Sequence, residues 1–449
     1  MPHTPTKKPW LTLPWQLPAA ALTLLYLTLA ALAARTFLHS KNGQYHGDFI
    51  HFYWAAQAMV NHQDLYTSGQ NGYIYPPLLA FLFQPLAFLS ERAADIAWLI
   101  ANMILNAGSL LIAVHAITRR LNFPKNRTLF FSIALLAALL SLDKIRSDFA
   151  LGQTDALMIL SFSLILLWYD TPPRNPILLG LAVAFGACIK YLQLIFLPYF
   201  LFRRRYAAIA TTLLGVAFFS LLPALTSGWN ENLHNLRSAY AGMFNMAGIH
   251  STTDTTTAPA TAANIEGIKW ERSISLTSAF SRLDDQFGAH KRLAALLILI
   301  FIIIFIFITH SLYREKKIPL FFRPNNHPAS NPMLCAEWAT LIILALILGP
   351  QTTSRHMVML LPTHALAAAL LLAPTQNLNK LPLLLTTILL FLSLLLPPGG
   401  PALDFWRNVA GASWCATLFA LALLNTSLDY AARMNTVSTE STEITEKKT

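Results

Sequence analysis

Leu293 to Ile308 reads LAALLILIFIIIFIFI, a run of 16 consecutive apolar residues that is followed within a few positions by the basic segment YREKK. A helix needs about 20 mainly apolar residues to cross ~30 Å of hydrocarbon. The run, extended to residues 292–313, therefore predicts a membrane-spanning helix. Comparable runs recur along the chain, so we expect an all-α polytopic membrane protein.

The composition of the chain supports this prediction. Of its 449 residues, 55% are apolar and only 12% are charged, whereas soluble domains carry about 25% charged residues. The net charge of +11 comes from Lys and Arg in short loops, as the positive-inside rule expects, and does not indicate nucleic acid as a partner. The cysteines, Cys188, Cys335 and Cys415, all lie in apolar runs, which predicts buried thiols without a disulfide or zinc site.

Basic residues set the expected topology. Lys7 and Lys8 predict a cytoplasmic N-terminus, and the span at 93–117 ends in TRRLNFPKNR, which should also be inside. The segment between them, YPPLLAFLFQPLAFL at residues 75–89, is short and contains three prolines. It could span or re-enter, and the charge pattern favours a re-entrant or interfacial helix. The first run, at 11–38, is too long for a cleavable signal peptide.

About twelve transmembrane helices follow, with both termini inside. We expect a membrane domain over residues 1–434, in the plasma (inner) membrane, with outer loops at 40–91, 143–155 and 226–291. A tail at 435–449, rich in Ser, Thr, Glu and Lys, is expected to be a disordered cytoplasmic end. The expected spans are 11–38, 93–117, 128–142, 154–169, 176–190, 191–202, 206–225, 292–313, 333–349, 356–373, 381–397 and 409–429.

The outer loops hold the unusual residues. In HGDFIHFYWAAQAM, residues 46–59, Asp48 precedes a helical pattern, and His51 shares its face. Asp48 suits the N-cap of that helix, and it also suits a catalytic carboxylate at the membrane boundary. The two roles do not exclude each other.

Cations at the outer ends of spans could bind an anion. Lys190 ends one span, where it could snorkel to the interface or hold a phosphate. Arg355 and His356 begin another, where a helix N-terminus adds to their attraction for anions, although an ordinary interfacial arginine is an alternative. Lys144 and Arg146 are weaker candidates of the same kind.

Metal chemistry is not expected. The histidines of the first loop, His46, His51 and His62, lack the spacing of a zinc site. Asp284 and Asp285 are adjacent, so they do not face one way on a helix, and we interpret them as a solvated pair. No metal or other cofactor is therefore predicted.

Four segments of the chain form an ordered set of motifs that covers most of residues 45–362. The segments are GDFIHFYWAAQAM with YIYPPLLAFLFQPLAFL, LGQTDALMILSFSLILL, LAVAFGACIKYLQLIFLPYFLFRRR and GPQTTSRHMVMLLP. Together they resemble glycosyltransferase family 87, whose members are polyprenol-phosphate-mannose-dependent mannosyltransferases with the GT-C membrane fold. The chain departs from the family pattern at Asp155, where an asparagine is usual, at Arg355, where a histidine is usual, and at residues 272–276, RSISL.

The resemblance implies transfer of a hexose, expected to be mannose, from a polyprenyl monophosphate to an acceptor hydroxyl on the outer side. Direct displacement with a carboxylate base predicts inversion, and the monophosphate leaving group together with the lack of a paired Asp-x-Asp motif predicts a reaction without a metal. Asp48 would be the general base, and Lys190, Arg355 and His356 would bind the donor phosphate. Substrate contacts are expected from His51, Tyr53, Tyr75, Gln153 and Asp155.

The expected partners are the lipid-linked donor, the bilayer and a glycan, glycolipid or protein acceptor. The aromatic residues of the first loop, Tyr53, Trp54, Tyr73 and Tyr75, could form a sugar platform or an interfacial belt. A binder or flippase-like transporter of lipid-linked sugar would need the cations and aromatics but no base. It remains the alternative to an enzyme.

Overall fold

The computed structural model describes residues 13–39, 47–67, 73–169, 176–246, 268–288, 292–320, 330–373, 378–396 and 400–446. These residues are mainly helical, which confirms the predicted all-α class. The elements are α1 Gln16–His39, α2 Phe49–Val60, η3 Leu65–Thr67, α3 Pro77–Ala87, α4 Glu91–Arg120, α5 Arg127–Leu140, α6 Leu142–Leu151, α7 Asp155–Trp168, α8 Pro176–Lys190, η4 Leu192–Ile195, α9 Phe196–Phe202, α10 Tyr206–Leu221, α11 Ala224–Ser227, α12 Trp229–Met246, α14 Leu276–Gln286, α15 Arg292–Glu315, α16 Ser330–Leu348, η6 Ser354–Leu360, α17 Leu361–Leu372, α18 Leu381–Leu395, α19 Pro401–Asn408 and α20 Gly411–Glu446.

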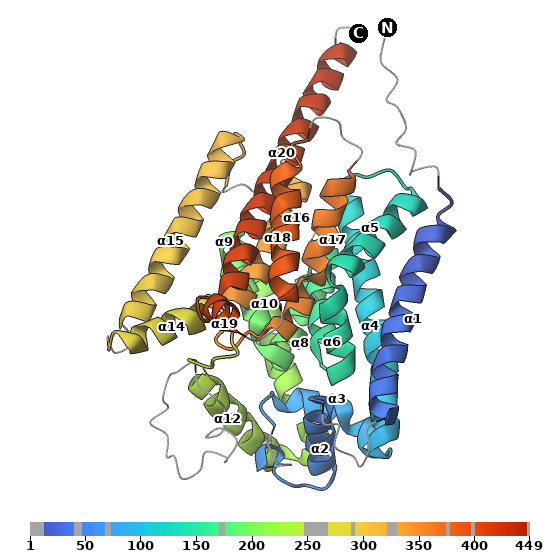
Figure 1. The fold of residues 1–449 in the computed structure, drawn as a ribbon, viewed down its shortest axis with the longest axis vertical. Coiled ribbons are helices and arrows are strands. Elements are labelled where there is room, and N and C mark those ends of the chain that lie inside the picture. Colours follow the sequence, from blue (N-terminus) through green and yellow to red (C-terminus); the bar gives the residue numbers. More distant parts are fainter. Residues whose placement is uncertain are drawn as a thin grey trace.

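The long helices form an elongated bundle (Figure 1). Seven described helices are long and apolar enough to cross a membrane, or eight if the bent pair α5 and α6 is one span. The expected spans coincide with helical segments, but 191–202 is divided between η4 and the short α9, and several others, such as α7 and α18, are shorter than a full span. The structure therefore confirms a polytopic membrane protein, and the number twelve stays a prediction.

Burial separates the inner helices from the outer ones. Helices α16, α17 and α20 are mostly buried, whereas α1, α10 and α15 expose most of their apolar surface. Small residues allow the close packing at the centre, since α17 carries buried Ala365 and the run Ala367–Ala369. The exposed faces of the outer helices are the surface that a bilayer would cover.

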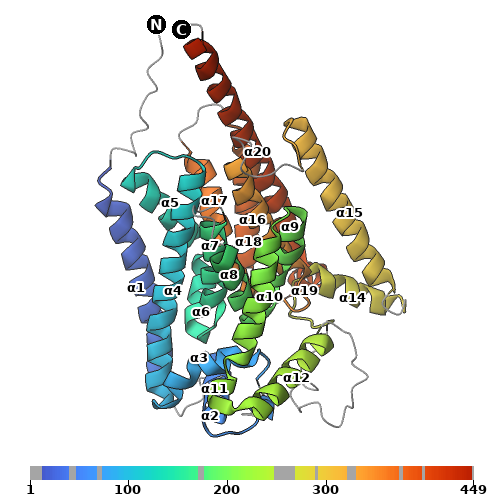
Figure 2. The same ribbon diagram turned by 180° about the vertical axis from the view of Figure 1, so that it is seen from behind.

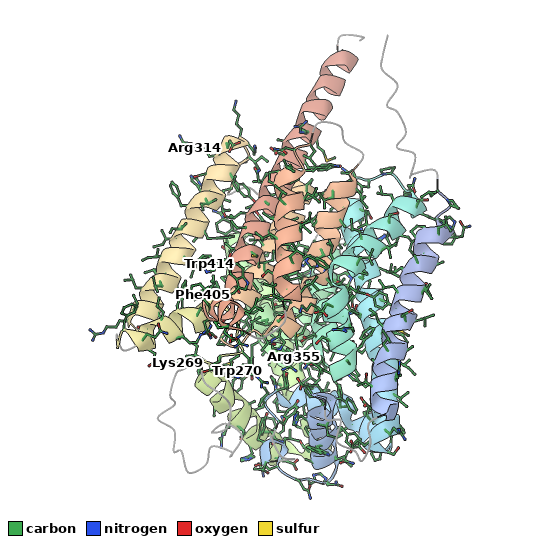
Figure 3. All side chains as sticks on the ribbon, viewed as in Figure 1. Lys269, Trp270, Arg314, Arg355, Phe405 and Trp414 are labelled. Carbon is green, nitrogen blue, oxygen red and sulfur yellow. The ribbon has the colours of Figure 1, made fainter. Side chains whose placement is uncertain are left out.

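The two ends of the bundle differ. The helices α2, α3 and α12 gather at one end, and the start of α1 and the end of α20 lie at the other (Figures 1 and 2). Arg314, in the basic segment that follows the 293–308 run, lies toward the same end as the start of α1 and the end of α20, while Arg355 lies toward the end with α2 (Figure 3). The arrangement agrees with the expectation that the first and the long loop share one side, opposite the termini.

Three expectations about the loops need correction. Residues 143–155 are mostly helix α6, bent by 68° from α5, where we expected a loop. The long loop at 226–291 contains the helices α12 and α14, although its low-complexity centre lies outside the described residues. Helix α20 continues to Glu446, where we expected a disordered tail. The residues from 435 to 446 include no Gly or Pro that would end the helix.

The segment 75–89 forms the short helix α3, which begins at Pro77 and contains Pro85. Its 11 residues are too few to cross a bilayer. Helix α3 packs against α2 (Figure 1). The length of α3 therefore fits the predicted re-entrant or interfacial helix.

Candidate functional site

Two glycines bring the first loop against the α6–α7 turn. Gly47 is buried, and a Cβ added to it would come within 2.8 Å of the Leu151 carbonyl oxygen. Gly152 has φ +62°, and a Cβ there would lie 2.5 Å from the Cβ of Phe49. Only glycine allows both contacts at this spacing. They place Asp48 beside Gln153, although 105 residues separate the two in sequence.

Asp48 binds two partners from distant segments. Its Oδ2 accepts a hydrogen bond from Arg355 Nη1 at 2.8 Å and another from Gln153 Nε2. Asp48 also occupies the N-cap position of α2, but its side chain makes no capping hydrogen bond. Its φ and ψ of −68° and −16° are helical, whereas a capping residue usually has extended angles. The capping interpretation is therefore wrong, and the carboxylate is directed to the site.

Lys190 does not snorkel. It is the last residue of α8, and its side chain is only 8% exposed and forms an ion pair with Asp155 Oδ1. The Nζ atom lies 5.4 Å from the centre of the Tyr75 ring. Asp155, the first residue of α7, is fully buried. The lysine is thus held inside the protein, where the buried Asp155 carboxylate provides its counter-ion.

Arg355 and His356 lie at the start of η6, as predicted. Thr353 and His356 form a capping box, in which His356 Nδ1 accepts a hydrogen bond from the Thr353 amide at 3.1 Å. An accepting Nδ1 places the ring proton on Nε2. His356 therefore offers a donor to a ligand, and its accepting nitrogen is already occupied.

The two ion pairs belong to one site. Lys190, Asp155, Arg355 and Asp48 all lie within electrostatic range of His356, and the same four groups act on Tyr75. Burial is the largest influence on Tyr75 and raises the pKa of its hydroxyl. The structure thus brings together most of the predicted residues, namely Asp48, Tyr75, Gln153, Asp155, Lys190, Arg355 and His356.

The other aromatic residues of the first loop have structural contacts. The Tyr53 hydroxyl donates to the Leu89 carbonyl oxygen at 2.7 Å, which ties α2 to the end of α3. The Tyr73 hydroxyl donates to the carbonyl oxygen of Pro76 at 2.8 Å and accepts from the amide of Ala80. These bonds leave Tyr75 as the better candidate for contact with a sugar.

His51 is half-buried, and its ring packs edge-to-face against Trp54 with 6.1 Å between the ring centres. No three His, Cys, Asp or Glu side chains are grouped as possible metal ligands in the described ranges. His46 lies outside those ranges. The contact to Trp54 gives His51 a packing role beside its predicted contact to substrate.

The weaker phosphate candidates are already engaged. Lys144 Nζ donates to Asp143 at 2.9 Å, to Ser354 Oγ at 2.8 Å and to the Leu394 carbonyl oxygen at 2.8 Å. Arg146 pairs with Asp143 at 2.9 Å. Lys144 therefore joins α6, η6 and α18 and supports the backbone that carries Arg355.

The interpretation of Asp284 and Asp285 as a solvated pair is half wrong. Asp285 is exposed and pairs with Lys269, but Asp284 is 4% exposed. Asp284 Oδ1 accepts hydrogen bonds from the amides of Leu293 and Ala294, at 2.9 and 3.3 Å. The carboxylate thus satisfies free amides in the first turn of α15, a contact that adjacency in sequence could not reveal.

Sequence analysis missed Asp148. It lies in the outer loop expected at 143–155, seven positions before Asp155, and it is 1% exposed. A spacing of seven would place two carboxylates on one face of a continuous helix, and this was the available signal. The bend at Gly152 interrupts the helix, so only the structure shows that both residues come near Lys190.

Comparisons with known proteins bear on the family of the chain. Residues 73–323 match the model of glycosyltransferase family 87. The chain is 28% identical over 232 residues to a protein of Mycobacterium tuberculosis named polyprenol-phosphate-mannose-dependent alpha-(1-2)-phosphatidylinositol mannoside mannosyltransferase, with 46% of this chain and 52% of that protein covered. It is 27% identical over 197 residues to a protein of the same name from Mycolicibacterium smegmatis, with 39% and 43% covered.

The chain thus spans about half the length of the curated relatives it matches. Among solved structures, ArnT from Cupriavidus metallidurans in the apo state superposes with a TM-score of 0.42 and 13% identity, covering 93% of this chain and 77% of that one. A score this low decides nothing about the fold. The family model, in contrast, covers more than half of the chain, and the protein belongs to glycosyltransferase family 87.

Proposed function

We propose that this protein transfers a mannosyl residue from a polyprenyl monophosphate to an acceptor hydroxyl. The observation that carries the proposal is the joining of Asp48 to Arg355 and of Asp155 to Lys190 at one site, which several distant segments build. The site supplies a carboxylate together with cations, which is what displacement of a phosphate by an alcohol requires. The names of the relatives, both dependent on polyprenol-phosphate-mannose, support the choice of donor.

The carboxylate of Asp48 takes the proton of the acceptor hydroxyl. The acceptor oxygen then forms a bond to the anomeric carbon as the bond from that carbon to the phosphate oxygen breaks. Direct displacement inverts the configuration at this carbon. Arg355, bound to Asp48 at 2.8 Å, orients the base before the acceptor arrives.

Lys190 and Arg355 stabilise the charge that develops on the leaving phosphate. Lys190 is buried, so its interaction with a phosphate would be little screened by water. His356 adds a hydrogen bond from Nε2, because its Nδ1 is held by the amide of Thr353. The cations do the work that a divalent metal does in other transferases, and we propose a reaction without a metal.

The reaction takes place on the outer face of the plasma (inner) membrane. The ends of the bundle support this placement, since α2 and α3 lie opposite the start of α1 and the end of α20 (Figure 1), and the positive-inside rule puts the termini inside. A lipid acceptor is consistent with the phosphatidylinositol mannoside in the names of the relatives. Residues 1–434 would form the catalytic membrane domain.

The test uses purified protein in liposomes with polyprenyl-phosphate mannose, GDP-mannose as the control donor, and a panel of lipid and glycan acceptors. We expect transfer from the polyprenyl donor alone, a product of inverted anomeric configuration by NMR, and the same rate with a chelator present. Retention of configuration would contradict direct displacement by the acceptor.

A non-catalytic binder or flippase-like transporter is the other outcome of this test. It would bind the donor lipid, or move it between leaflets, with no new glycosidic bond on any acceptor of the panel. The Asp48 carboxylate would then serve only to hold Arg355.

A further inference from the structure

Asp148 is a buried carboxyl group that the proposed reaction does not use. It lies on α6, one turn before the bend at Gly152, and is 1% exposed. Neither of its oxygens makes a hydrogen bond of standard geometry with a residue in the described ranges. Asn102 lies beside it, but the Asn102 amide donates to the Gln153 carbonyl oxygen at 3.0 Å.

The charged groups near Asp148 come from neighbouring helices. Asp155 on α7 and Lys190 on α8 act directly on it. On α1, Tyr26 is close, and its hydroxyl donates to Asn106 Oδ1 at 2.7 Å. Two buried carboxyl groups therefore lie near one buried ammonium group.

Helix η6 also packs along α6 and carries Arg355 and His356. Arg355 is bound to Asp48, and His356 has its Nδ1 occupied by the Thr353 amide. Neither is available as a counter-ion for Asp148 in this arrangement.

The charges do not balance if both carboxyl groups ionise. Asp155 Oδ1 holds Lys190, and Asp155 Oδ2 makes no hydrogen bond within the described residues. A second negative charge would then be buried without a partner, which is costly at low dielectric constant. Two carboxyl groups in such a position share a proton, so that one of them stays neutral.

We propose that Asp148 is a positioning residue that controls Lys190 through its protonation. As the neutral acid, it leaves Lys190 opposed by Asp155 alone, and the ammonium can turn to an incoming phosphate. When Asp148 releases its proton to solvent, two carboxylates hold Lys190 and compete with that phosphate. The proposal rests on the proposed function, because the phosphate is that of the polyprenyl donor.

The test measures the affinity for polyprenyl-phosphate mannose between pH 5 and 9. The donor is a phosphodiester and does not itself titrate in this range. Wild-type Kd should increase by up to about tenfold per pH unit once Asp148 ionises, since one proton is linked to binding. In Asp148→Asn that increase should disappear, because the amide cannot ionise.

Asp143→Asn is the matched control. It also removes a carboxylate from α6, but that carboxylate pairs with Lys144 and Arg146 and not with Lys190. It should keep the wild-type dependence of Kd on pH. The same slope in Asp148→Asn as in the wild type, or a wild-type Kd that is constant over the range, would overturn the proposal.

A second measurement needs no donor. The folded protein keeps the Asp148 proton at pH values where the unfolded chain has released it, so wild-type stability falls as pH rises through that window. Asp148→Asn lacks this loss, and its Tm relative to wild type should increase from pH 5 to 8. A difference in Tm that does not change with pH would contradict a neutral Asp148, whether or not the wild type binds the donor. A wild type that binds no donor would refute the proposed function.

If Asp148→Asn does not fold, infrared spectra of the wild type decide. A buried neutral acid gives the carbonyl band of a protonated carboxyl group at neutral pH, shielded from exchange with D2O. The absence of this band would overturn the proposal.

Discussion

Asp48→Asn separates chemistry from architecture at the centre of the site. The amide keeps an oxygen that can accept from Arg355 or Gln153, but it cannot take a proton from the acceptor hydroxyl. Removing a general base of this kind slows a reaction by about 10²–10⁴-fold. We therefore expect transfer to fall at least about 100-fold while donor binding persists.

The structural cost of this substitution follows from exposure. The side chains of Arg355 and Asp48 are 32% and 36% exposed, and ion pairs so accessible to water contribute about 0–1 kcal/mol. Asp48→Ala is the contrasting variant, because it also leaves the Gln153 amide without its acceptor. Gln153 is 2% exposed, and an unsatisfied buried donor costs about 1–3 kcal/mol.

The assay is single-turnover transfer from polyprenyl-phosphate mannose in proteoliposomes, beside thermal unfolding of each variant. Asp48→Asn should unfold within a few degrees of wild type, and Asp48→Ala should unfold at a lower temperature. Transfer by Asp48→Asn at the wild-type rate would refute the assignment of the base. His356 would not be the replacement, because its accepting Nδ1 is occupied by the Thr353 amide.

Three further predictions concern the donor pair, the turn and the topology. Lys190→Met should abolish donor binding and destabilise the protein by about 3–5 kcal/mol, because Asp155 is left buried without its counter-ion. Adding Asp155→Asn to this variant should recover most of the stability but not the donor binding. Recovery of both would show that Lys190 does not bind the phosphate. Gly152→Ala should lower the stability by about 1–3 kcal/mol, since φ is +62° and the new Cβ meets Phe49, which denaturant unfolding would measure and an unchanged midpoint would contradict. A cysteine at the exposed Gln63 should react with an impermeant thiol reagent in whole cells, and one at the exposed Lys125 should not. The background should be low, because the native Cys188, Cys335 and Cys415 are buried. Labelling of Lys125→Cys would show that the 75–89 segment spans the membrane.

The structure argues against Gly47 as a labelling site. From the sequence alone, a cysteine at Gly47 in the first loop would be expected to be tolerated. The structure shows that a side chain there would meet the Leu151 carbonyl oxygen. A labelling site in this loop therefore belongs at its exposed end, near Gln63.

The sequence by itself determined the class of the protein and most of its helices. An apolar run such as 293–308 must form a helix in hydrocarbon, because every backbone amide and carbonyl group must find a hydrogen-bond partner within the segment. The resemblance in ordered motifs identified the family, and the matching of residues 73–323 confirmed it. It also selected Asp48, Lys190 and Arg355 before any contact was known.

Tertiary structure decided the partners of these residues. The sequence did not decide whether Asp48 caps a helix or acts as a base, or whether Lys190 snorkels or binds a phosphate. Local patterns describe only neighbours within about one helical turn. The ion pairs join positions 307 and 35 residues apart, and they depend on glycine contacts between backbones that no periodicity encodes. The same reason hid Asp148 and the capping role of Asp284: a buried carboxylate is defined by what surrounds it in space, and those surroundings exist only once the helices have packed.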